Sequence, residues 1–193
     1  MGQHVDVTDP DIHEPKGVAS QTAGRVYVSD GAGSGSWQRV NVEYAFGSMT
    51  ITNNTSALAM TAGDLANNSS YVTFTGTPAP YVGENLEGVS FSVDKLTVPF
   101  TGIYEVSAYM NISQFPSTTA KIGMKYKVNG STFSSRAPKV KSAVTSDETQ
   151  ITGFGLVSLN ANDFVQIAVA SDANGNLIVR DMNVIIKLVR KTA

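Results

Sequence analysis

The chain has 193 residues, with 14 Lys and Arg against 16 Asp and Glu, and its formal net charge is −2. Such a balance gives no broad positive field, so neither nucleic acid nor an anionic membrane surface is an expected partner. The absence of cysteine excludes disulfides, thiolate metal sites and thiol nucleophiles. This length suits one folded domain with an additional segment.

Residues 1–45 differ from the rest in composition, and we expect them to form an extended anchoring arm and linker. The first residues lack the basic stretch and apolar run of a secretion signal, and no segment approaches the ~20 apolar residues that span a bilayer. From His4 to Lys16 the chain is acidic, contains prolines and has few apolar residues, so it cannot bury enough surface to fold alone. We therefore expect synthesis in the cytoplasm and an arm that a partner holds.

The second half of this arm contains two aromatic residues. A short alternating strand over 24–29 includes Tyr27, and a flexible Gly- and Ser-rich loop over 30–36 leads to Trp37, the only tryptophan. A tryptophan in a weakly apolar segment gains most when a groove buries it, and another chain is expected to supply that groove. The residues expected to anchor the arm are Pro15, Val26, Tyr27, Val28 and Trp37.

The remainder, 46–193, is predicted to be one β-domain. Apolar and polar residues alternate over 89–93 and 103–112, which is the period of strands with one buried face. Residues 184–189 are apolar on both faces except at Lys187, which predicts a central strand with cover on both sides of the sheet. The segment 136–141 is basic and contains Pro, a pattern that protects an exposed edge strand, with a polyanion or glycan contact as the alternative.

Turn residues separate these strands. Asn129-Gly130 and the segment 172–176 have the composition of tight hairpin turns, because Asn and Gly tolerate positive φ angles. Helix signals are scarce. Eight or more short strands with such turns predict an all-β antiparallel sandwich, and their spacing favours a jelly roll over an immunoglobulin-like domain.

Residues able to support catalysis are also scarce. The 2 histidines, His4 and His13, lie in the arm, where nothing fixes the geometry of a metal site or a Ser-His-Asp triad. Asp147 and Glu148 stand in a polar connection, where carboxylates stay solvated. We expect no enzymatic activity, no metal and no other cofactor.

Two segments of the domain resemble the C1q/TNF-like jelly roll. Residues 96–108, Leu-Thr-Val-Pro-Phe-Thr-Gly-Ile-Tyr-Glu-Val-Ser-Ala, look like the family's segment that leads into a long central strand. Residues 156–167 are similar to its strand-turn-strand, with Asn162 where Gly is usual, and Asn also tolerates a left-handed turn. The resemblance covers about 70–190 and implies a homotrimer. Its interface is expected at Phe100, Tyr104, Tyr109 and Phe164, with the protomer's own core as the alternative for each.

The arm resembles a second group of proteins. Residues 14–19 and 24–37 are similar to the N-terminal segment of structural proteins in tailed bacteriophages, particularly head fibres and capsid decorations. The resemblance implies a virion protein that its arm attaches to a capsid or other virion protein. The alternative is a receptor-binding tip that recognises a host surface glycan. A soluble hydrolase is disfavoured because the domain has no histidine.

Overall fold

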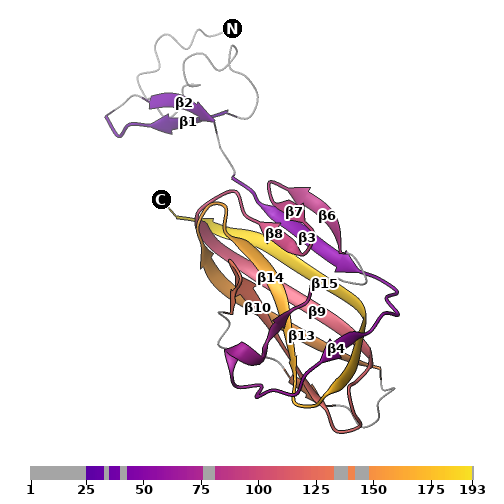
Figure 1. Cartoon of the computed structure of the whole chain (residues 1–193). Coiled ribbons are helices and arrows are strands. Elements are labelled where there is room, and N and C mark those ends of the chain that lie inside the picture. The colour runs from indigo at the N-terminus through magenta and orange to yellow at the C-terminus, as the bar shows by residue number, and fades with distance from the viewer. Residues whose placement is uncertain are drawn as a thin grey trace. The chain divides into compact units, whose positions relative to one another are not determined.

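The computed structural model describes residues 25–32, 35–39, 43–75, 81–132, 139–141 and 148–192. The chain divides into two compact units, Met1–Glu43 and Tyr44–Ala193. Figure 1 shows a small hairpin in the first unit and a two-sheet sandwich in the second.

The hairpin of the first unit consists of β1 (Arg25–Ser29) and β2 (Gly35–Arg39), paired antiparallel. Tyr27 lies opposite Trp37, and their ring centroids are 5.4 Å apart in an edge-on arrangement. The segment predicted to be a flexible loop therefore closes a hairpin, and the backbone N–H of Ala32 donates to Asp30 Oδ1 within it. Cross-strand aromatic pairs stabilise such hairpins by about 0.2–1 kcal/mol, which leaves an isolated hairpin marginal.

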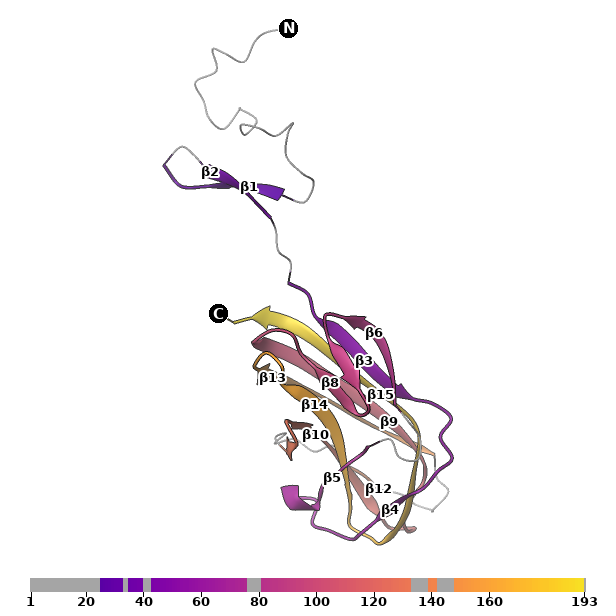
Figure 2. The same cartoon turned by 45° about the horizontal axis from the view of Figure 1, so that its top comes forward.

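The second unit contains two antiparallel sheets (Figures 1 and 2). The first sheet, which we call the front sheet, consists of β3 (Phe46–Ile51), β4 (Leu58–Met60), β6 (Val82–Glu87), β9 (Gly102–Gln114), β13 (Thr149–Leu159) and β15 (Gly175–Lys191). The other sheet consists of β5 (Val72–Thr73), β7 (Ser90–Ser92), β8 (Lys95–Thr97), β10 (Lys121–Val128), β11 (Ser131–Thr132), β12 (Lys139–Lys141) and β14 (Phe164–Ser171). A 3₁₀ turn, η4 (Asn68–Ser70), precedes β5.

The pairing of the strands is that of a jelly roll. Eight strands form the jelly roll, which in chain order are β3, β8, β9, β10, β12, β13, β14 and β15. The first of them, β3, pairs with the last, β15, and the second, β8, pairs with the seventh, β14. The third pairs with the sixth, β9 with β13, and the fourth with the fifth, β10 with β12. This nested pairing places two Greek keys on two sheets. The predicted fold class, an all-β antiparallel jelly-roll sandwich, is confirmed.

The core lies between the two sheets. Along β9 every second side chain is buried, as the alternation predicted, and β15 pairs with β9 on one side and β3 on the other. The central position predicted for 184–189 is therefore confirmed, whereas the predicted cover on both sides is wrong for the protomer, in which Ile185 is half-buried and Val189 is 54% exposed. Burying each large aliphatic side chain stabilises the fold by roughly 1.5–3 kcal/mol. The largest fully buried side chains are Tyr104, Phe115, Met49, Ile51, Leu96, Met110, Ile112, Ile122, Leu159, Ile167, Leu177 and Met182.

Two predicted turn features are confirmed by backbone geometry, and one is wrong: the segment 172–176 connects β14 to β15, which lie in different sheets, so it is not a hairpin turn. Asn129 and Gly130 have φ angles of 50° and 76° and connect β10 to β11. Asn162, which precedes β14, has φ 72°, so it does adopt the left-handed conformation in the place of the glycine expected there.

Val93, in the turn between β7 and β8, has φ 56° and is 69% exposed. A β-branched residue at positive φ is strained by about 1–2 kcal/mol, whereas Asn tolerates this region. We expect Val93→Asn to raise the free energy of unfolding by about 1 kcal/mol in chemical denaturation. Val72→Asn, at an exposed valine in a regular strand, is the control and should not stabilise. Equal stability of Val93→Asn and the wild type would contradict the inferred strain.

Tyr81 lies in the core, where its hydroxyl donates to the Phe74 carbonyl at 3.0 Å. Burial, with a smaller contribution from the charge of Asp94, raises the pKa of Tyr81 well above its ordinary value of 10.0. The folded state therefore holds the Tyr81 proton more tightly than the unfolded state does. The stability that comes from this difference is fully present below pH 10 and is lost as pH rises above 10. We expect Tyr81→Phe to flatten the loss of thermal stability between about pH 9 and 11, at a cost of about 1 kcal/mol at pH 7. An unchanged alkaline slope would contradict this.

Candidate interaction surface

The outer surface of the front sheet carries exposed apolar side chains from adjacent strands. Phe154 is 76% exposed, Leu156 is 65% exposed and Tyr109 is 37% exposed, and the half-buried Ile185 lies among them. Monomeric proteins rarely leave a contiguous group of this kind uncovered. We call these four residues the apolar strip: Tyr109 on β9, Phe154 and Leu156 on β13, and Ile185 on β15.

Strand register brings the strip together. Residues directly opposite each other on neighbouring strands have Cβ atoms about 5 Å apart. The rows across β13, β9 and β15 are Thr152–Tyr109–Asn183, then Phe154–Ser107–Ile185, then Leu156–Glu105–Lys187. The small Ser107 lies in the middle row, and a shallow pocket of about 140 Å³ opens beside it. Its lining consists of Ser107, Ala108, Tyr109, Thr152, Asn183 and Ile185.

The outward position of Phe154 and Leu156 follows from what faces inward on β13. A Cβ atom on Gly155 would collide with the hydroxyl of Tyr126, which comes from β10 of the opposite sheet. Tyr126 therefore fills the space that a side chain at this position would take. Because successive side chains alternate between faces, the neighbours of Gly155 point away from the core.

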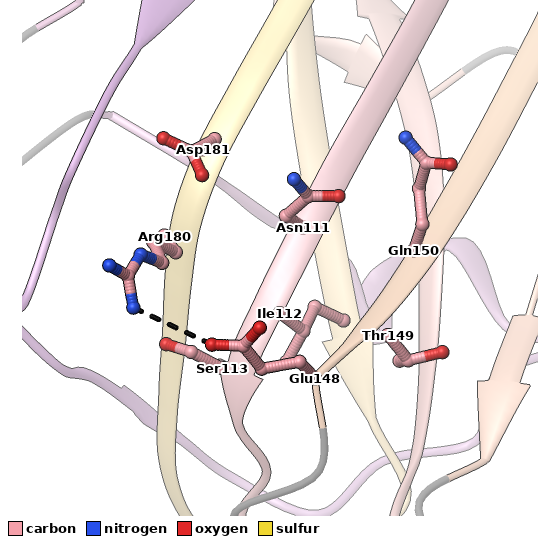
Figure 3. A pocket seen from close by; sticks show the side chains of 8 residues that line it. All are labelled: Asn111, Ile112, Ser113, Glu148, Thr149, Gln150, Arg180 and Asp181. Atoms are coloured by element: carbon pink, nitrogen blue, oxygen red, sulfur yellow. Dashed lines mark hydrogen bonds and ion pairs between the residues drawn. The ribbon is translucent and has the colours of Figure 1, made fainter.

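A polar pocket of about 460 Å³ lies further along β9, β13 and β15 (Figure 3). Gln150, Asn111 and Asp181 form the next row of the same face. Arg180 and Glu148 point toward each other with 3.5 Å between Nη1 and Oε1, and both are largely exposed, so the pair contributes at most about 1 kcal/mol. The pocket's lining is Asn111, Ile112, Ser113, Glu148, Thr149, Gln150, Arg180 and Asp181.

The aromatic residues predicted at an interface lie in different environments. Tyr104 is 0% exposed and its hydroxyl donates to the Phe100 carbonyl at 2.9 Å, so the core alternative holds for it and it offers no surface to a partner. Phe100 packs against the core. Phe164 is half-buried, with the Lys95 ammonium 4.7 Å from its ring centroid. Tyr109 alone of the four belongs to the apolar strip.

The residues predicted to anchor the arm lie on the hairpin, except Pro15, which is outside the described residues. Val26 and Val28 are exposed, and alternation places them on one face of β1. Tyr27 and Trp37 share the opposite face and are half-buried against each other. Their role in anchoring stays a prediction.

The described residues contain no cluster that could hold a metal ion and no helix that could cross a membrane. Among residues 25–32, 35–39, 43–75, 81–132, 139–141 and 148–192, no three His, Asp or Glu side chains gather closely enough to hold a metal ion. In the same part of the chain, no helix has both the length and the hydrophobicity needed to cross a bilayer.

Comparison with known proteins finds similar structures but no family model and no curated protein that matches. Murine APRIL at pH 8.0 is 14% identical, with a TM-score of 0.47 over 76% of this chain and 100% of that one. The Eiger TNF of S. frugiperda is 12% identical, with a TM-score of 0.48 over 77% of this chain and 96% of that one. The globular domain of zebrafish complement 1qA is 15% identical, with a TM-score of 0.43 over 78% of this chain and 100% of that one. The pairing of strands described above defines the fold independently of these structures.

Proposed function

We propose that this protein is a structural virion protein, a homotrimeric fibre or decoration that its N-terminal arm attaches to a bacteriophage particle. The observation that carries the assembly is the apolar strip, which is exposed in the single protomer and crosses three neighbouring strands of the front sheet, from the end strand β13 to the central β15. The proposal of three copies rests on the resemblance of the domain to the C1q/TNF-like jelly roll. The virion role rests on the resemblance of the arm to the N-terminal segment of tailed-bacteriophage structural proteins.

A second copy of this chain suits the apolar strip as its partner. The strip is bordered by Glu105 and Lys187, which lie opposite each other in the row of Leu156. A face that carries both signs of charge suits a ring of identical copies, since the Glu105 carboxylate of one copy can meet the Lys187 ammonium of the next. Around a threefold axis each interface joins two different parts of this face, and the rotation closes the assembly.

The proposed attachment rests on the first unit. Its hairpin presents Val26 and Val28 on one exposed face, and a short exposed strand edge is suited to pairing with another chain. Three arms from one assembly would bind together, which raises their effective concentration at the particle and offsets the entropy lost by each arm.

Removal of the arm tests attachment directly. We expect a chain that starts near Asn41 to keep the thermal transition and oligomeric mass of the full chain but to be lost from particles, because the arm contributes little to the head's core. Light scattering gives the mass, and cosedimentation with particles that lack this protein gives attachment. Tyr27→Ala with Trp37→Ala in the full chain should weaken attachment in the same direction.

The outcome of this truncation separates the parts of the proposal. A truncated head that still binds particles would show that the arm is not the anchor. A truncated head that unfolds would show that the arm belongs to the folded domain. A full chain that runs as a monomer at micromolar concentration would remove the role of the apolar strip.

The alternative function is a receptor-binding tip for a host surface glycan. The polar pocket favours this alternative, because amide, carboxylate and guanidinium groups line the pocket and such groups bind sugar hydroxyls. None of its lining residues is aromatic, so the pocket lacks a ring on which a sugar can stack. A glycan array with the full chain, and with Asn111→Ala as a variant, tests this alternative.

A further inference from the structure

Asn183 lies at the centre of the front sheet, and its side chain faces the same way as the apolar strip. It stands on β15 between Tyr109 on β9 and Thr50 on β3. With Ile185 and Tyr109 it lines the pocket of about 140 Å³. Its neighbours on this face are the apolar Tyr109 and Ile185 on one side and the polar Thr50 and Asp181 on the other, so an aliphatic side chain could also pack here.

The side-chain oxygen of Asn183 has no hydrogen-bond partner. Among the buried side-chain nitrogen and oxygen atoms of the described residues, Asn183 Oδ1 is the one that lacks a partner. The hydroxyl of Thr50 does not serve it, because that hydroxyl donates to Glu84 Oε1 at 3.1 Å. Native proteins satisfy nearly all buried acceptors, since a buried acceptor without a donor destabilises the fold.

We propose that Asn183 is the residue that sets the register and the number of copies in the assembly, by hydrogen bonding to Asn183 of the neighbouring copies around the rotation axis. This inference rests on the proposed function, because it requires copies that meet through the apolar strip. An amide carries both donor hydrogens and an acceptor oxygen, so identical amides around an axis bond head to tail, each Nδ2 donating to the next Oδ1.

The free protomer can reach this arrangement with a small movement. Rotation about χ2 of asparagine is soft, and the proposed ring requires a partial rotation that turns the amide so that Oδ1 and Nδ2 both face the neighbouring copies. A ring of amides forms only in one register, and the distance from each Nδ2 to the next Oδ1 changes with the number of copies, so it suits hydrogen bonding for one number. Sliding the copies along the strip, or adding one, leaves amides buried without partners, whereas aliphatic contacts alone tolerate such shifts.

Two substitutions at Asn183 test this, each with a matched control at Asn176. Asn176 is also on β15, but it is exposed and pairs with Ala59 on β4. The variants of the full chain are Asn183→Val and Asn176→Val, then Asn183→Asp and Asn176→Asp. Circular dichroism first establishes that each variant keeps the β-fold, and native mass spectrometry and sedimentation equilibrium then give the masses and dissociation constants.

Asn183→Val is expected to remain associated but to lose its single mass. Valine can be buried at this position without leaving an unsatisfied acceptor, so the melting temperature should rise. The mass spectrum should show two or more oligomeric species where the wild type shows one. Asn176→Val should keep the single species of the wild type.

Asn183→Asp is expected to make assembly depend on pH. Carboxylates that share one site repel each other, which raises their pKa in the assembly, so protonation at low pH favours association. We expect its dissociation constant to be about 100-fold higher at pH 7.5 than at pH 5.0, and that of Asn176→Asp to change by less than about threefold. The titratable side chains of neighbouring rows, Tyr109, Glu84, Asp181, Glu105 and Lys187, are present in all variants, so the wild type at both pH values is their control.

Three outcomes are decisive. A mixture of masses for Asn183→Val together with pH-dependent dissociation of Asn183→Asp supports the inference. A wild-type oligomer in which both Asn183 variants behave like the Asn176 variants overturns the inference and leaves the proposed function intact. A wild-type monomer overturns the proposed function and this inference with it.

Discussion

Replacing Phe154 and Leu156 together with aspartate should convert the protein from an oligomer into a folded monomer. Both side chains are mostly exposed in the protomer, so the fold loses almost nothing. The interface loses two buried side chains worth roughly 1.5–3 kcal/mol each and gains charges that would have to be desolvated. The dissociation constant should rise at least about 100-fold, as measured by sedimentation equilibrium.

A single valine outside the strip provides the control for this variant. Val72, on β5 of the other sheet, is 48% exposed, and Val72→Asp should leave the oligomeric mass unchanged. An unchanged mass for the double variant, with its β-fold intact by circular dichroism, would show that assembly uses another surface.

Gly175→Ala should destabilise the head by about 2–4 kcal/mol, because the substitution combines backbone strain with a collision. Gly175 begins β15 with φ 140°, a conformation that L side chains rarely adopt. A Cβ atom there would overlap the carbonyl oxygen of Pro116 and lie 3.0 Å from its carbonyl carbon. Thermal unfolding should show a melting temperature lower by about 5–15 °C.

Gly130→Ala is the matched comparison for Gly175→Ala. Gly130 also has positive φ, at 76°, but nothing lies within 4 Å of the position its Cβ would take. Backbone strain alone then acts, and the free energy of unfolding should fall by about 1 kcal/mol. Equal losses at the two glycines would mean that the segment around Pro116 moves aside.

Sequence patterns predicted the parts of the fold that depend on local chemistry. In residues 184–189, Val184, Ile186 and Leu188 face the core, and Ile185 on the other face belongs to the apolar strip. Asn129-Gly130 predicted a hairpin turn because few other residues accept the required φ angles. The closure of the first hairpin was not predicted, since it depends on the pairing of Tyr27 with Trp37 across a loop without regular alternation.

The interaction surface was harder to predict for a physical reason. Alternation says that side chains on a strand divide between two faces, but it does not say which face is the core. On β9 the aromatic Tyr104 faces the core, while Tyr109, five positions later, faces out. On β13 the apolar residues Ile151, Val157 and Leu159 face the core as usual. Between them, the inward place of Gly155 is filled by Tyr126 from another strand, while Phe154 and Leu156 face outward. Only the tertiary contact shows that Tyr126 takes this place.

The central place of β15 has a consequence for the synthesis of the protein. β15 is the last of the described strands, yet it joins β3 to β9, so the front sheet stays in two pieces until β15 is available. A ribosome that has not yet released residues 175–191 therefore holds a nascent chain with unpaired strand edges and an incomplete core. Folding of the head must await the emergence of this strand, and chains cut short within it should be removed as unfolded protein rather than accumulate as partial heads.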